Sequence, residues 1–483
     1  MINRVTDNIK YNMLTNSMFN IQGQYGQLME KLSTQKSVNR PSDDPIGTNS
    51  ILDFRTALVS IEQYQSNITD ATSWLKLTET NIGGLRNIIS QAQSMAVSES
   101  GANGSPETRA ASLDTLESLI SEALSMLNAQ SGDNYIFGGS VTDAKPFSIN
   151  RASAAATVNA ASTNVFDGTV TATYSGTENK SYALRIVSGG PLASATYRIS
   201  TDGGKTWGAL QTDLSAPVTV DGLTMNFSAG TNNLASNDQF VIKATAAGYY
   251  SGNNDVLDTI IGKNNSMPFN VTGAEAFTGQ FALASVLTGA TGITADSSIG
   301  LTKNASGTWS LDPNTQYPNL TITSQSSDNV TIDVDNDGTD DIVVDLTGTW
   351  DTGNTIELSI KAGMTPGGIP TKFEGSGSID LMSALNALKS ALVGSDQDRA
   401  MELIGAQLDN LQKVDTQLLK YETKAGARMQ SMEITSKNHK SMDLQITNML
   451  GDIENADLTK LITEFQMKQI ALEASYKMAA QIG

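Results

Sequence analysis

Residues 51–89 read ILDFRTALVSIEQYQSNITDATSWLKLTETNIGGLRNII, and this stretch decides the fold of the chain. Apolar residues recur in it at an interval of seven: Phe54, Ile61, Ile68, Leu75, Ile82 and Ile89. Such a repeat places the side chains on one face of an α-helix, and an apolar face needs another helix to cover it. We therefore predict a long helix that packs within a helical bundle.

The two ends of the chain carry a shorter version of the same pattern. Apolar residues there form the predicted assembly helices: Leu14, Met18, Ile21, Tyr25, Leu28, Leu32, Leu458, Ile462, Phe465, Leu472 and Tyr476. Isolated amphipathic helices of this length are marginal in water, so they fold when neighbours cover them. We predict that the two ends pair and carry the contacts between copies of the chain.

Proline residues mark the predicted helix starts. Pro41 and Pro45 end a first helix that covers about residues 2–36, and Asp44 before Pro45 is typical of an N-cap followed by proline in the first turn. Ser105 and Pro106 start a third helix in the same way. The second and third helices are therefore expected to form an antiparallel hairpin.

The middle of the chain has a different composition. Residues 151–374 are rich in Thr, Ser, Asn, Gly and Val, with strand-like alternation as in Val330, Ile332 and Val334. We predict an α+β fold, an elongated multi-helix bundle or coiled coil made from both termini, with an inserted antiparallel β domain. The predicted domains are 1–44 with 450–483, then 45–150 with 375–449 including a β-hairpin, then 151–374, which we expect to divide near 248–266.

Composition excludes several classes of function. The chain has 483 residues, a net charge of -19, no cysteine and one histidine. Residues 151–374 hold 21 acidic and 10 basic side chains, which argues against nucleic acid or an anionic membrane as the partner. Without cysteine, thiolate nucleophiles and thiolate metal ligands are excluded. A single histidine leaves few side chains from which a catalytic or zinc site could be built. No enzyme activity, cleaved signal peptide or membrane insertion is expected.

Two motifs in the β region are candidate binding sites. Asp333, Asp335, Asp337 and Asp341 alternate in an Asp-rich loop whose carboxylates suit calcium, although an empty, solvated turn is an equal alternative. Ser200–Trp207 matches the Asp-box of sialidase-like repeats, and a single copy favours a structural turn over glycan hydrolysis. No cofactor is required in either case, and structural calcium is the candidate.

His439 is the single histidine of the chain. It stands between Lys437 and Lys440 in a predicted C-terminal helix, on what should be the solvated face. A general base would need a partner and a cleft, which this segment does not suggest. We predict a solvated surface side chain.

Three segments carry a resemblance to a known family. They are NRPSDDPIG at 39–47, NYIFGG at 134–139 with the following Thr142 and Pro146–Phe147, and ADLTKLITEFQMKQIALEASYKMAAQI at 456–482. On these, the chain resembles the flagellin superfamily, and within it the hook-associated protein 3 type found at the hook–filament junction. The resemblance covers about residues 1–147 and 379–482. Relatives commonly continue beyond the Ala-Ser-Tyr-Lys motif into a leucine-rich tail, so either the inner layer is short or the sequence is incomplete.

The resemblance implies an extracellular structural subunit of the bacterial flagellum. Its implied partners are copies of itself, hook-associated protein 1, flagellin and an export chaperone, with type III export instead of a cleaved signal. A filament flagellin is the near alternative, and a glycan-binding surface protein is a remote one that depends on the two β-region motifs.

Overall fold

A computed structural model describes residues 7–101, 104–176, 178–287, 292–374, 377–393 and 397–482. The chain divides into two compact units. Unit 1 comprises Met1–Asp70, Ile260–Ser266 and Ser431–Gly483, and unit 2 comprises Ala71–Thr259 and Met267–Gln430. No helix of the described residues is long and apolar enough to cross a membrane.

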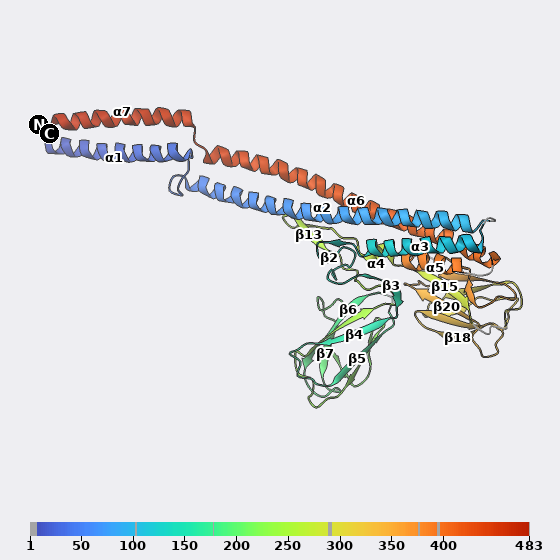
Figure 1. Cartoon of the computed structure of the whole chain (residues 1–483). Helices are drawn as coiled ribbons and strands as arrows, with labels where there is room; N and C mark the ends of the chain where they lie inside the picture. The colour runs from blue at the N-terminus through green and yellow to red at the C-terminus, as the bar shows by residue number, and fades with distance from the viewer. Residues whose placement is uncertain are drawn as a thin grey trace. The chain divides into compact units, whose positions relative to one another are not determined.

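The predicted α+β class is confirmed (Figure 1). The described helices are α1 Asp7–Thr34, α2 Pro45–Glu99, α3 Pro106–Leu127, α4 Gly273–Phe277, α5 Leu381–Val393, α6 Gln397–Glu454 and α7 Leu458–Ile482. Helices α1 and α7 pair, and the β-strands lie between α3 and α5 in the sequence. The order of helices, then strands, then helices is therefore as predicted.

The heptad residues of α2 form the core of the helical part. Ile61 and Ile68 are buried in unit 1, and Leu75, Ile82 and Ile89 are fully buried in unit 2. In unit 2, α6 supplies facing residues at steps of three and four, namely Leu411, Val414, Leu418, Tyr421 and Ala425. Arg86 of α2 adds ion pairs to Asp415 and Glu422 of α6, each with a nitrogen to oxygen distance of 2.9 Å.

The predicted helix starts are also confirmed. The Asp44 carboxylate accepts hydrogen bonds from the backbone N–H groups of Ile46 and Gly47, which caps α2. Ser105 and Thr108 form a reciprocal capping box at the start of α3. Gly84 lies where α3 approaches α2, because a Cβ there would stand 2.7 Å from the Met126 sulfur.

The NYIFGG segment follows α3 and forms a small aromatic core in unit 2. Strands β1 Gln130–Ser131 and β2 Asn134–Tyr135 pair, and the next residues, Ile136 and Phe137, are fully buried. The ring of Phe137 meets Phe277 of α4 at a centroid distance of 4.8 Å. Gly139 has φ +71 and packs against Asn253, so a side chain would fit there neither conformationally nor sterically.

The strands that follow β2 form two sandwiches and two separate two-stranded pairs. The first sandwich has one sheet of β4 Ala155–Ala160, β11 Gln239–Thr245, β6 Lys180–Ser188, β7 Thr196–Ser200 and β8 Gln211–Thr212, and another of β5 Thr169–Tyr174, β10 Leu223–Ser228 and β9 Val218–Val220. Both sheets contribute to one buried core, which includes Leu184, Met225 and Phe240. Strands β3 Phe147–Ala152 and β12 Gly248–Tyr250 pair with each other where the chain enters and leaves this sandwich.

The second sandwich is built in the same way. Its sheets are β18 Thr321–Gln325, β19 Asn329–Asp333, β20 Ile342–Thr347, β15 Phe281–Val286 and β22 Gly367–Ile369, and β17 Trp309–Leu311, β16 Ser297–Lys303, β21 Thr355–Ile360 and β23 Thr371–Glu374. The rings of Phe281, Phe373, Trp350 and Trp309 follow one another in edge-to-face contacts. Each ring pair adds about 1 kcal/mol beyond its buried area.

Candidate assembly site

The terminal helices α1 and α7 form a helical pair in unit 1. Tyr25 of α1 stacks on Phe465 of α7 at a centroid distance of 4.7 Å. The six assembly residues predicted in α1 are all half-buried: Leu14, Met18, Ile21, Tyr25, Leu28 and Leu32. The α1 pattern thus identifies the face that meets α7.

The predicted assembly residues of α7 are divided between half-buried and exposed positions. Phe465 and Leu472 are half-buried, but Leu458, Ile462 and Tyr476 are exposed. Among the side chains of α7 that the structure describes, Leu461 and Ser475 are buried. Leu461, Phe465, Leu472 and Ser475 follow steps of three, four and seven, and the small polar serine hides this second stripe in the sequence.

Both helices keep large apolar side chains in water. On α1 these are Ile9, Met13, Phe19 and Met29, and on α7 they are Leu458, Ile462, Met467, Ile470, Tyr476 and Met478. Of the 27 exposed large apolar side chains among the described residues, ten lie on these two helices. We call these ten residues the terminal apolar faces.

A built joint connects α1 to α2 and α6 to α7 within unit 1. The two helix breaks pair with each other through a backbone bridge between Lys36 and Asn455. The Ser37 N–H donates to the Glu454 carbonyl at 2.7 Å, and the Ala456 N–H donates to the Gln35 carbonyl at 3.0 Å. The breaks in the two halves of the chain are therefore held at the same level.

Glu454 ties this joint together. Its buried carboxylate pairs with Lys36 and with Arg55, whose guanidinium nitrogen lies 2.9 Å from the carboxylate oxygen. The hydrogen bond from Lys36, with that from Arg55, lowers the pKa of Glu454, so the carboxylate stays charged. The two helix breaks could be predicted from the sequence. The role of Glu454 could not, because its partners Lys36 and Arg55 are distant from it in the sequence.

The helical part of this arrangement matches a known family. Residues 5–142 match the family described as the bacterial flagellin N-terminal helical region. This range covers α1, the connection from α1 to α2, α2, α3 and the NYIFGG segment. Over these residues the chain is similar to the flagellin family.

Two curated relatives of this chain carry one name. The chain is 29% identical over 145 residues to flagellar hook-associated protein 3 of Salmonella typhimurium, and 30% identical over 146 residues to that of Escherichia coli. Each match covers 30% of this chain and 46% of the relative. The chain thus matches about half the length of these relatives.

Solved structures of similar proteins include two hook-associated proteins. Flagellar hook-associated protein 3 of Legionella pneumophila gives a TM-score of 0.42 at 14% identity, covering 83% of this chain and 98% of that one. A putative flagellar hook-associated protein from Vibrio parahaemolyticus gives a TM-score of 0.41 at 12% identity. This match covers 86% of this chain and 100% of that one.

The Asp-rich loop brings three of its four predicted residues together. Oxygen atoms of Asp333, Asp335 and Asp341 lie within 4.8 Å of one another, whereas the Asp337 carboxylate turns to the Thr339 N–H. Burial raises the pKa of Asp341, and the neighbouring carboxylates add to the effect. Asp333 already accepts hydrogen bonds from the Asn336 and Gly338 N–H groups, so the loop is also held by its own backbone. Calcium binding here stays a prediction.

The Asp-box braces a turn of the first sandwich. The Asp202 carboxylate accepts hydrogen bonds from the Ser200 hydroxyl and from the Thr206 N–H and hydroxyl. These bonds lower the pKa of Asp202, chiefly through Ser200. The Arg185 guanidinium lies over the Trp207 ring, 4.7 Å from its centroid. The contacts are those of a structural turn.

The prediction for His439 is wrong. Its ring is half-buried in unit 1, with Nε2 2.7 Å from the Ile261 carbonyl oxygen and the ring 5.6 Å from that of Tyr64. The error has a physical source: residues 260–266 are distant in sequence and cover a helix face that looks solvated in the sequence.

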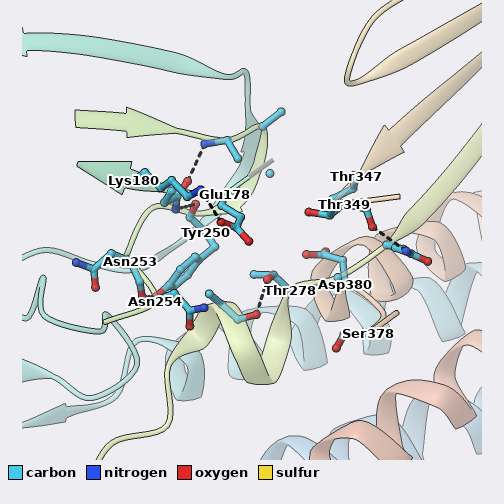
Figure 2. A pocket seen from close by; sticks show the side chains of 18 of the residues that line it. Glu178, Lys180, Tyr250, Asn253, Asn254, Thr278, Thr347, Thr349, Ser378 and Asp380 are labelled. Atoms are coloured by element: carbon cyan, nitrogen blue, oxygen red, sulfur yellow. Dashed lines mark hydrogen bonds and ion pairs between the residues drawn. The ribbon is translucent and has the colours of Figure 1, made fainter. Parts of the chain in front are cut away.

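A polar cleft of ≈ 530 Å³ lies within unit 2 and was not foreseen (Figure 2). Its polar side chains largely bond to the protein itself. Asn253 donates to Ser140 and Asp255, and Asn254 accepts from the Thr272 hydroxyl. Asp380 lines the cleft and caps α5 by accepting from the Ser383 N–H, and burial raises its pKa to about 6. The lining thus stabilises the junction between the sandwiches and the helices of unit 2.

Proposed function

We propose that this chain is a structural subunit of the bacterial flagellum that joins the hook to the filament, and that it binds copies of itself through α1 and α7. The observation that carries the proposal is the terminal apolar faces, which a pair of helices cannot cover alone. Relatives named flagellar hook-associated protein 3 support the place in the flagellum.

The charge distribution supports packing of like copies. Residues 1–45 hold four acidic and five basic side chains, so neighbouring terminal helices would repel each other little. The excess of acid lies in residues 151–374, whose side chains would face water. The proposed role is structural and uses no catalytic residues.

The partners in this proposal are flagellar components. The subunit would contact hook-associated protein 1 on the hook side and flagellin on the filament side, and an export chaperone would bind it before type III export. It would act outside the cell, without insertion into a membrane.

Removal of residues 446–483 tests the proposal. Cells that carry only the shortened chain should make hooks without filaments and release flagellin monomers into the medium, while the shortened protein remains folded. Circular dichroism on the purified protein checks the folding, and electron microscopy of the cells checks the filaments. Normal filaments would refute the role of the terminal helices.

The alternative is a filament flagellin, which the family match to the flagellin N-terminal helical region also allows. The two roles differ in position along the flagellum. Immunogold labelling confined to the hook end supports the junction role, whereas label along the whole filament supports the alternative.

A further inference from the structure

A short hairpin of the β region contacts the helices of unit 1. Strands β13 Asp258–Gly262 and β14 Asn265–Pro268 form a two-stranded sheet, and Asn264 in the turn has φ 58. Residues Ile260–Ser266 belong to unit 1, although the chain on either side of them belongs to unit 2. The hairpin is therefore a segment of the insert that folds with the helices.

The hairpin bonds to both long helices at once. The side-chain amide of Asn67 in α2 donates to the Ile260 carbonyl at 2.8 Å, and Nε2 of His439 in α6 lies 2.7 Å from the Ile261 carbonyl. Because a carbonyl oxygen only accepts, His439 must carry its proton on Nε2 in this contact. Strand β13 thus links the two helices through consecutive carbonyl groups.

Two adjacent isoleucines show which face of the hairpin is seated. The Ile261 side chain is 1% exposed, while the Ile260 side chain is 58% exposed. The Tyr64 and His439 rings lie beside each other at the same place on α2 and α6. Ile261 therefore fills an apolar seat on unit 1, and Ile260 points to solvent.

This part of the helical pair has few other core residues. In unit 1, the large buried apolar side chains described in α2 and α6 are Ile51, Ile61, Ile68, Met432 and Ile446. Two helices alone bury little area, and marginal pairs open locally at low free energy. A third element that adds a fully buried isoleucine has a large effect on such a pair.

We propose that the β13–β14 hairpin is a latch, and that its seating on Tyr64, Asn67 and His439 controls whether α2 and α6 of unit 1 are closed against each other. The latch makes ordering of residues 45–70 and 431–454 conditional on the folding of a segment in the β insert. It goes beyond the proposed function, because it acts within a single copy of the chain.

Hydrogen exchange on the full-length protein tests the latch with two matched variants. Ile261→Ala should speed amide exchange in 45–70 and 431–454 roughly tenfold or more, because the seat is emptied. Ile260→Ala, which removes the same atoms from the neighbouring exposed position, should leave these rates unchanged. Equal rates in the two variants, or faster exchange confined to residues 258–268, would overturn the proposal.

The single histidine gives a second, independent readout. In the full-length protein diethyl pyrocarbonate can modify only one imidazole, so its reaction rate reports directly on His439. We expect Ile261→Ala to raise this rate several-fold and Ile260→Ala to leave it at the wild-type value. A wild-type rate in Ile261→Ala, together with a correctly folded unit 2, would show that the hairpin does not open.

Discussion

Units 1 and 2 differ in how completely they bury their apolar side chains. Of the 27 exposed large apolar side chains among the described residues, 18 lie in unit 1 and nine in unit 2. Unit 2 is nevertheless the longer unit by far, with residues 71–259 and 267–430. Its helices and both sandwiches enclose their own cores, whereas the helices of unit 1 leave many large apolar side chains exposed. The comparison teaches that unit 2 buries its apolar residues within itself far more completely than unit 1 does.

The most damaging change we expect is a charge in the core of unit 2. Ile82 is fully buried in α2, so Ile82→Asp places an unpaired carboxylate in an apolar interior. We expect a loss of about 4 kcal/mol or more in the free energy of unfolding. Urea denaturation followed by circular dichroism measures it. A loss below about 1 kcal/mol would mean that unit 2 is not closed around α2.

A neutral substitution in unit 2 should stabilise it. The raised pKa of Asp380, about 6 against an ordinary 3.8, means that the folded protein favours the protonated form. The contribution of Asp380 to the free energy of unfolding is therefore most favourable below about pH 4, and it is lost as the pH rises through about 6. Asp380→Asn keeps a cap for α5 and should raise the free energy of unfolding by up to about 3 kcal/mol at pH 7. Denaturation at pH 7 and pH 4 checks this, since the gain should vanish at the lower pH.

A change in the joint of unit 1 should have a smaller effect. Glu454→Gln removes the charge that pairs with Lys36 and Arg55, both of which are substantially exposed. We expect a cost of about 1 kcal/mol at pH 7. Because the folded pKa is lowered, this stabilisation exists above the ordinary glutamate pKa and is lost as the pH falls below it. Hydrogen exchange of the Ser37 and Ala456 amides measures the effect. If these amides are equally protected in Glu454→Gln and in the wild type at pH 7, the ion pairs of Glu454 do not stabilise the joint.

A charge on the terminal apolar faces should leave the monomer intact. Ile470 is exposed on α7, so Ile470→Asp should change the free energy of unfolding by less than about 0.5 kcal/mol. It should nevertheless prevent attachment of filaments in cells. Ile149→Asp is the matched control, because Ile149 is similarly exposed but lies in unit 2. Equal motility of the two variants would remove the functional difference between the units.

The smallest expected effect concerns the Asp-rich loop of unit 2. If calcium binds Asp333, Asp335 and Asp341, its removal by a chelator should lower the melting temperature of the full chain by a few degrees. Asp337→Asn should not alter that shift, because the Asp337 carboxylate turns to Thr339. An unchanged melting temperature would leave the loop as a turn held by its backbone hydrogen bonds.

The helical half of the fold could be predicted because its information is local. A repeat of seven from Phe54 to Ile89 and the Asp44–Pro45 cap each depend on neighbouring residues, and the structure has both. The alternating pattern of the insert likewise predicted antiparallel strands. The pairing of particular strands, such as β6 with β11, depends on residues more than fifty positions apart and has no local signal.

The candidate site was predicted less completely for the same reason. The half-buried α1 residues follow a single apolar stripe in the sequence, whereas α7 has two overlapping stripes, one half-buried or buried and one largely exposed. Glu454 and the seat of His439 were missed, since each contact joins segments that the sequence separates widely. Whether the terminal apolar faces bind other copies stays a prediction.

The pairing of β3 with β12 has a practical consequence. Ala152 lies opposite Gly248 in this ladder, so the chain leaves for the first sandwich and returns from it at neighbouring positions. A short connector could bridge the gap without moving either flank, because closing a small loop costs little chain entropy. Residues 153–247 are thus a natural cassette, where a foreign domain with adjacent termini could be grafted.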